Sequence, residues 1–229
     1  AGVARWDGRI AFDAFSDRER EMASETAGNP VFLEDEINTG KAQVQAWMNA
    51  YSRNRWENQP YYPEVFIEKK ALEGVFLKAC SSNHVALGAC KGYPSITFLY
   101  EASLRFMEAE DRGKQPIILY FGDYDPSGED IPRVLEDNLK RLGCSSIEVR
   151  RIALNESQVI DWNLPPAPTK ATDTRSVNWT GIGQVELDAV KPEKLISLLE
   201  AALADIFDYD LYDILMEEEE NEREIYRQE

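Results

Sequence analysis

Apolar runs alternate with helical stripes between residues 64 and 152. A short continuous apolar run is typical of a strand buried on both faces, whereas apolar residues three and four apart indicate an amphipathic helix. Strands that alternate with helices in this way predict a parallel sheet with right-handed crossovers. We therefore expect an α/β, Rossmann-like domain with four parallel strands flanked by helices. The expected strands are 64–67, 85–90, 117–121 and a half-polar edge strand at 147–152, and the helical stripes begin at Ala71, Ile96 and Ile131.

The segments on either side of this core divide the chain. Helical spacing over 38–55 predicts a connecting helix, and we assign residues 1–60 to an N-terminal helical segment. Residues 61–229 then form one domain, in which 155–184, rich in Pro, Thr and Asp, is a long loop followed by acidic C-terminal helices. The chain opens without methionine, so we expect it to be part of a larger protein.

Composition limits the possible functions. The chain has 229 residues, and 43% are hydrophobic, which is enough for one sizeable core. It has neither a long apolar run nor a signal-peptide pattern, so we expect no membrane association and a cytoplasmic location. The net charge of −17 opposes contact with nucleic acid, because phosphates require Lys and Arg. Part of that charge lies in the acidic run 217–220 near the C-terminus.

Acidic residues follow two of the expected strands. Asp123 and Asp125 come directly after the strand at 117–121, and Glu68 follows the strand at 64–67. Because a parallel sheet gathers the carboxyl ends of its strands at one edge, we expect these carboxylates to converge there. They would hold a hard cation, Mg²⁺ or Mn²⁺. Alternatively, the two aspartates only form a turn before Pro126.

Two helix starts carry capping signals. Ser95 precedes the stripe that begins at Ile96, and a serine at that position can accept a hydrogen bond from the first turn. Ser127 and Asp130 are three residues apart, which has the form of a capping box. On this interpretation the aspartates before Ser127 stay outside the helix.

The acidic and glycine positions together resemble the Toprim domain of topoisomerases, primases and related nucleases. The matching residues are Glu68, Gly92, Asp123, Asp125 and Gly128. The likeness covers about residues 64–152, and it is nearest to the variant in the A subunit of type IIB topoisomerases and in related bacterial and phage proteins. This resemblance implies that Glu68, Asp123 and Asp125 are catalytic, bind Mg²⁺ and act on the DNA backbone. It also implies an upstream winged-helix domain, of which residues 4–7 resemble the last turn.

Three basic residues are candidates for binding phosphate. Lys69 stands where the family usually has glycine. Lys170 and Arg175 lie in the long loop, and the alternative for them is a solvated loop without phosphate contact. The expected function is Mg²⁺-dependent cleavage of DNA, as in a nuclease or topoisomerase. One alternative is a noncatalytic DNA-binding or assembly module that works as a homodimer or with a partner subunit. Nucleotidyl transfer of the primase type is a further alternative.

Overall fold

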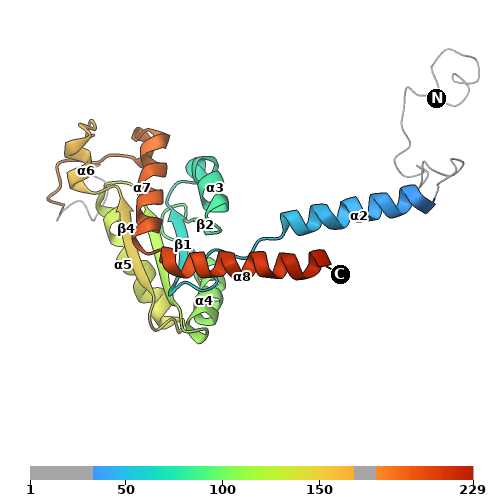
Figure 1. Ribbon diagram of the computed structural model, residues 1–229. Helices are drawn as coiled ribbons and strands as arrows, with labels where there is room; N and C mark the ends of the chain where they lie inside the picture. Colours follow the sequence, from blue (N-terminus) through green and yellow to red (C-terminus); the bar gives the residue numbers. More distant parts are fainter. Residues whose placement is uncertain (1–32, 168–178, 229) are drawn as a thin grey trace, which may run out of the picture. The chain divides into compact units, whose positions relative to one another are not determined.

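The computed structural model describes residues 33–167 and 179–228 (Figure 1). The chain forms two compact units, Ala1–Tyr51 and Ser52–Glu229. Helix α2 of the first unit, Leu33–Ala50, ends earlier than the expected connecting helix. The reason is that the backbone N–H of Arg53 donates to the Glu219 carboxylate at 2.7 Å, so this stretch already belongs to the second unit. The N-terminal turn attributed to a winged helix lies outside the described residues.

The second unit is built on a four-stranded sheet, which confirms the predicted fold class. All pairings are parallel, and the strand order is β2-β1-β3-β4. The central strands are fully apolar in their second halves and buried there, whereas β4 is largely half-buried, as the half-polar pattern predicted. The bounds are β1 Tyr61–Ile67, β2 Ala86–Ala89, β3 Gln115–Phe121 and β4 Glu148–Ala153.

Helices cover both faces of the sheet. Alternation along β1 sends Val65 into the core shared with α3 and α7, and sends Phe66 into the core shared with α4 and α5. As predicted, the Ser95 hydroxyl accepts from the backbone of Phe98 at 3.2 Å and starts α4. The helix bounds are α3 Glu73–Ser82, α4 Ile96–Asp111, α5 Pro126–Arg141 and α7 Pro192–Asp205. Two short 3₁₀ helices span Lys70–Leu72 and Leu187–Ala189.

The stretch predicted as a loop at 155–184 contains additional structure. Helix α6, Glu156–Asp161, begins where the Gln158 side chain accepts from the backbone N–H of Asn155 at 2.9 Å. It is too short for periodicity to reveal it. Ala167 and Gln184 then pair as an antiparallel bridge, with hydrogen bonds of 2.8 and 2.9 Å.

The C-terminal helices were predicted correctly, and one residue of the acidic run within them is buried. Helix α8, Tyr209–Gln228, runs as one long helix past the end of the sheet (Figure 1). Its Glu219 is only 2% exposed, and it accepts from both the Arg53 backbone and the Arg223 side chain. Arg53 also pairs with Glu218 at 2.7 Å. None of the described helices is apolar over a length that would cross a bilayer.

Candidate active site at the carboxyl edge of the sheet

Glu68 and Asp123 are joined directly at the carboxyl edge of the sheet. They follow the adjacent strands β1 and β3, whose register ends with Ile67 opposite Phe121. The Glu68 backbone N–H donates to the Phe121 carbonyl at 2.9 Å, and the Asp123 backbone N–H donates to Glu68 Oε2, also at 2.9 Å. The buried Tyr120 hydroxyl donates to the same oxygen at 3.2 Å. The expected convergence of these two acids is therefore observed.

The backbone around Asp123 is held by its neighbours. Leu187 donates its N–H to Asp123 Oδ1 at 2.6 Å, and Arg151 donates to the Asp123 carbonyl at 2.7 Å. Gly128 lies so close that a Cβ there would come within 2.2 Å of the same carbonyl. The glycine in the motif is therefore required by close packing between the turn and the first turn of α5.

Asp125 caps helix α5, which corrects the predicted capping box. Its Oδ1 accepts the N–H of Gly128 at 2.6 Å, and Pro126 occupies the first turn. Ser127 thus lies inside the helix. Asp130 instead accepts from the Tyr93 hydroxyl at 3.0 Å and from Arg133 at 2.7 Å. An aspartate followed by proline was itself a helix-start signal, because proline is favoured in the first turn.

The three acids share one arrangement. Glu68, Asp123 and Asp125 each use one carboxylate oxygen to accept a backbone N–H. Within the described part of the chain, the second oxygens of Glu68 and Asp125 have no hydrogen bond or ion pair, and Asp123 Oδ2 lies 3.7 Å from the Lys69 ammonium. Each side chain is thus oriented by the main chain, and Glu68 and Asp125 each keep one oxygen for another partner.

Burial makes this edge electrostatically unfavourable for negative charge. Desolvation raises the pKa of Glu68, and the charges of Asp123 and Asp125 raise it further, against the opposing effect of the Asp123 N–H. Desolvation also raises the pKa of Asp123, although the Leu187 N–H and the charge of Lys69 act in the opposite direction. A cation placed among these groups would relieve that cost.

Lys69 supplies a positive charge at this edge. Its Nζ lies 2.8 Å from Glu186, 3.3 Å from Asp188 and 3.7 Å from Asp123. Burial opposes the charge of Lys69, but the three carboxylates outweigh it, and the pKa of Lys69 is raised. Glu186 and Asp188 lie around the start of the 3₁₀ helix Leu187–Ala189, which brings both carboxylates to this edge.

The fit of this edge to a metal ion is partial. In residues 33–167 and 179–228, no group of three or more His, Cys, Asp or Glu side chains has the geometry of a metal site. The expected three-carboxylate cage is therefore not formed by the described atoms. However, Mg²⁺ is usually held by one or two carboxylates together with water and substrate phosphates. The open oxygen of Glu68 fits that mode of binding, and Asp123 Oδ2 fits it if the ion takes the place of the Lys69 ammonium.

Of the three basic residues predicted to bind phosphate, the structure describes only Lys69. Lys69 lies at the acidic edge, with its charge directed to carboxylates. Lys170 and Arg175 lie outside the described residues, so their role stays a prediction.

A comparison of the sequence with protein-family models and with curated proteins found no match.

Proposed function

We propose that this chain is a Mg²⁺-dependent enzyme of the Toprim type that cleaves the DNA backbone. The observation that supports the proposal most strongly is the shared arrangement of Glu68, Asp123 and Asp125. Each is fixed by a backbone N–H at the edge where parallel sheets bind their ligands, Glu68 and Asp125 each keep one oxygen open, and the second oxygen of Asp123 faces Lys69 at 3.7 Å. Such rigid positioning is what catalysis requires of charged groups.

The residues have distinct roles in this proposal. Asp123 would hold Mg²⁺ together with a phosphate of the substrate, and Asp125 would contribute its open oxygen from the start of α5. Glu68 would either join them as a ligand or act as the general base. When bound, the ion stabilises negative charge on the phosphate and lowers the pKa of bound water. Glu68, whose pKa is raised mainly by burial, is suited to accept a proton from the attacking group. That group is water in hydrolysis, or a tyrosine from another domain in transesterification.

Lys69 favours a second candidate function. Its ammonium group already neutralises Asp123, Glu186 and Asp188, so the acidic edge is partly compensated without an added ion. Together with the net charge of −17, which opposes contact with DNA, this contact supports a noncatalytic assembly module that depends on a partner subunit. In that case the same edge has a structural role.

A plasmid-nicking assay with Mg²⁺ or Mn²⁺ separates the two candidates. Glu68→Gln and Asp123→Asn keep an acceptor oxygen for their backbone partners but remove the charge. We expect each to reduce nicking by at least about a hundredfold. Asp137→Asn is the matched control, because Asp137 is an exposed carboxylate on α5 that pairs with Arg133 at 2.9 Å. It should nick at the wild-type rate.

The form of the products distinguishes the chemical routes. Free 5′ or 3′ ends indicate hydrolysis, and protein covalently attached to a DNA end indicates transesterification. If the wild-type chain nicks DNA neither alone nor with a tyrosine-bearing partner, the enzymatic proposal is wrong. The noncatalytic module is then favoured.

A further inference from the structure

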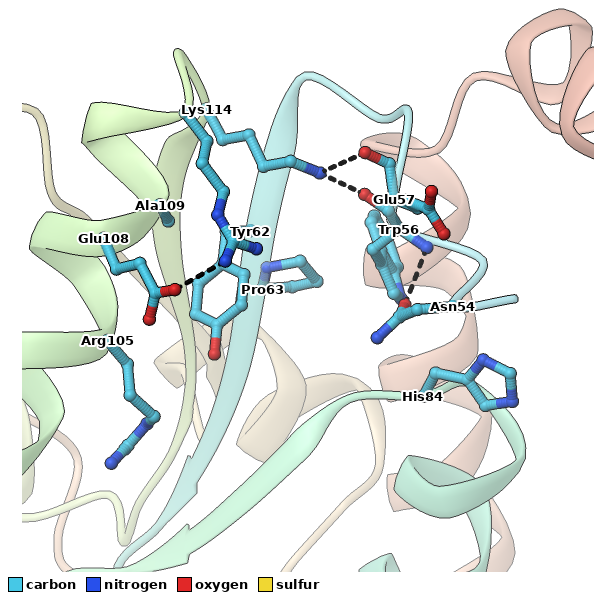
Figure 2. Close-up of a pocket in the computed structure, with 11 residues that line it drawn as sticks. Asn54, Trp56, Glu57, Tyr62, Pro63, His84, Arg105, Glu108, Ala109 and Lys114 are labelled. Carbon is cyan, nitrogen blue, oxygen red and sulfur yellow. Dashed lines mark hydrogen bonds and ion pairs between the residues drawn. The ribbon is translucent and has the colours of Figure 1, made fainter. Parts of the chain in front are cut away.

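A cavity opens at the amino edge of the sheet, away from the acidic site. It has a volume of about 620 Å³. Figure 2 shows Tyr62 and Pro63 of β1 between α4 on one side and the segment that carries Trp56 on the other. Tyr62 lies near the start of β1 and Glu68 follows its end, so the two are about 20 Å apart along the chain at 3.3 Å per residue. The cavity is thus separate from the carboxyl edge.

Three long basic side chains line this cavity, on a chain of net charge −17. They are Arg105, Arg112 and Lys114. Arg105 is fixed by Glu64, which is 1% exposed, through two hydrogen bonds of 2.7 and 2.8 Å. Its charge is therefore matched within the protein. Arg112 is exposed, and it bonds to Glu108 one turn earlier on α4 at 2.5 Å.

Lys114 differs from the arginines because its charge is not matched. Its ammonium group donates to the backbone carbonyls of Trp56 and Glu57, the second at 2.9 Å (Figure 2). In the described part of the chain, no carboxylate lies within ion-pair distance of its Nζ. Burial lowers the pKa of Lys114, the nearby charge of Arg112 lowers it further, and the carboxylate of Glu57 only partly opposes them. An anion bound at this position would offset both the burial of the Lys114 charge and its repulsion from Arg112.

The rest of the lining is mixed. Tyr62 and Pro63 are suited to an organic group, and the other lining residues are Asn54, Trp56, Glu57, His84, Glu108 and Ala109. The Tyr62 hydroxyl donates to Glu64 at 3.2 Å, and burial raises the pKa of Tyr62 to about 12, so the ring is neutral at ordinary pH. Pro63 lies beside it and adds a second apolar surface. Small-molecule sites commonly combine such apolar walls with a few fixed polar groups, in volumes of about 300–1,000 Å³.

We propose that this cavity binds a phosphate-bearing ligand of nucleotide size. Lys114 and Arg112 contact the phosphate, the Arg105–Glu64 pair holds the wall of α4 in place, and Tyr62 with Pro63 contacts the organic part. The proposal does not depend on catalysis at the carboxyl edge. The other explanation is structural: Lys114 only fastens the turn at Trp56 and Glu57.

Isothermal titration of the full chain with ADP, pyrophosphate and adenosine tests the proposal. We expect ADP to bind with a Kd below about 100 µM, pyrophosphate to bind about tenfold more weakly, and adenosine to show no binding at about 1 mM. Equal affinity for ADP and pyrophosphate would assign the site to phosphate alone and remove the role of Tyr62 and Pro63. No binding of either phosphate compound would overturn the proposal.

Charge-neutral variants locate the site. Arg112→Gln should weaken ADP binding about tenfold, because a charge-assisted hydrogen bond to phosphate is lost. Arg133→Gln is the matched control: Arg133 is an exposed helical arginine with carboxylate partners at 2.7 and 2.9 Å, but it lies on α5. Equal weakening in both variants would indicate nonspecific attraction and overturn the proposal. Asp123→Asn should bind ADP as the wild type does, which separates this site from the carboxyl edge.

Lys114→Met removes the charge but keeps an unbranched stem. We expect ADP binding to disappear while the circular dichroism spectrum and the melting transition stay close to those of the wild type. If melting falls sharply and Arg112→Gln binds ADP normally, Lys114 has only the structural role and the proposal fails.

Discussion

The two edges of one sheet hold their charged side chains in different ways. At the carboxyl edge, Glu68, Asp123 and Asp125 are oriented by main-chain N–H groups. At the amino edge, Arg105 is oriented by a buried side chain, and Lys114 by main-chain carbonyls. The direction of the strands accounts for part of this difference. The acids at the carboxyl edge come directly after strands, so their side chains meet the backbone N–H groups of the segments that begin there.

This comparison indicates which edge tolerates substitution. A carboxylate fixed by the backbone keeps its position only while the turn keeps its shape, so glycine positions matter there. A cation fixed by a buried carboxylate depends on that one partner, so loss of a single side chain matters more at the amino edge. The following predictions test this distinction, beginning with the largest effect.

Gly128→Ala should destabilise the protein by at least about 3 kcal/mol, since the new methyl group would overlap the Asp123 carbonyl. The overlap is with backbone, which cannot rotate away. Gly74→Ala on α3 is the control, because a Cβ there meets nothing within 4 Å. It should stabilise the protein by about 0.5–1 kcal/mol through helix propensity. Urea unfolding of both variants measures the contrast, and equal stability would refute the packing argument.

Arg105→Met should cost about 2 kcal/mol, because it leaves the Glu64 carboxylate buried without its cation. The estimate is below the usual range for buried pairs, since Arg105 itself is 44% exposed and partly screened by solvent. Arg112→Met removes an exposed pair on the same helix and should change stability by less than about 0.5 kcal/mol. A similar loss in both variants would show that the burial of Glu64 is unimportant.

Asp123→Asn should stabilise the folded chain at neutral pH while it abolishes the proposed activity. The reason is that burial raises the pKa of Asp123 despite the charge of Lys69, so the ionised form is a net cost. The amide oxygen still accepts the Leu187 N–H. Thermal melting at pH 7 is the measurement, and a lower melting temperature would show that the Lys69 pair dominates.

The smallest expected effect is on pH dependence. Because the pKa values of Glu68 and Asp123 are raised in the folded state, the folded chain binds more protons than the unfolded chain just above the ordinary carboxyl range. These two groups therefore favour folding increasingly as the pH falls toward that range, and they cost stability as it rises. Between about pH 7 and pH 5, the free energy of unfolding of Glu68→Gln should gain less from acidification than that of the wild type, because one of the two groups that take up protons on folding is lost. An unchanged slope would contradict the assignment.

The sequence predicted what depends on short-range pattern. The buried strands, their parallel order and the cap at Ser95 follow from local periodicity and side-chain chemistry. The meeting of Glu68 and Asp123 was also predictable, because parallel strands share one edge. The cap at Asp125 was missed although Pro126 indicated it, since the serine gave a competing signal.

Contacts between distant segments were not predictable in the same way. Lys69 pairs with Glu186 across 117 positions of the chain, and no period in the sequence relates them. The amino-edge cavity joins the 54–57 segment to the end of α4, so none of its parts carries a motif. Such sites depend on how the layers pack, which a single sequence does not specify locally.

The contact between Arg53 and Glu219 brings the first and last parts of the second unit together. Chain ends that lie close in space permit circular permutation, because a short linker can join them without distorting the core. New termini could then be opened in the exposed turn at Gly113, between α4 and β3, to give a permuted protein beginning at the central strand. The same closeness makes this unit suitable for insertion into a surface loop of a host protein, with its ends replacing the two sides of that loop.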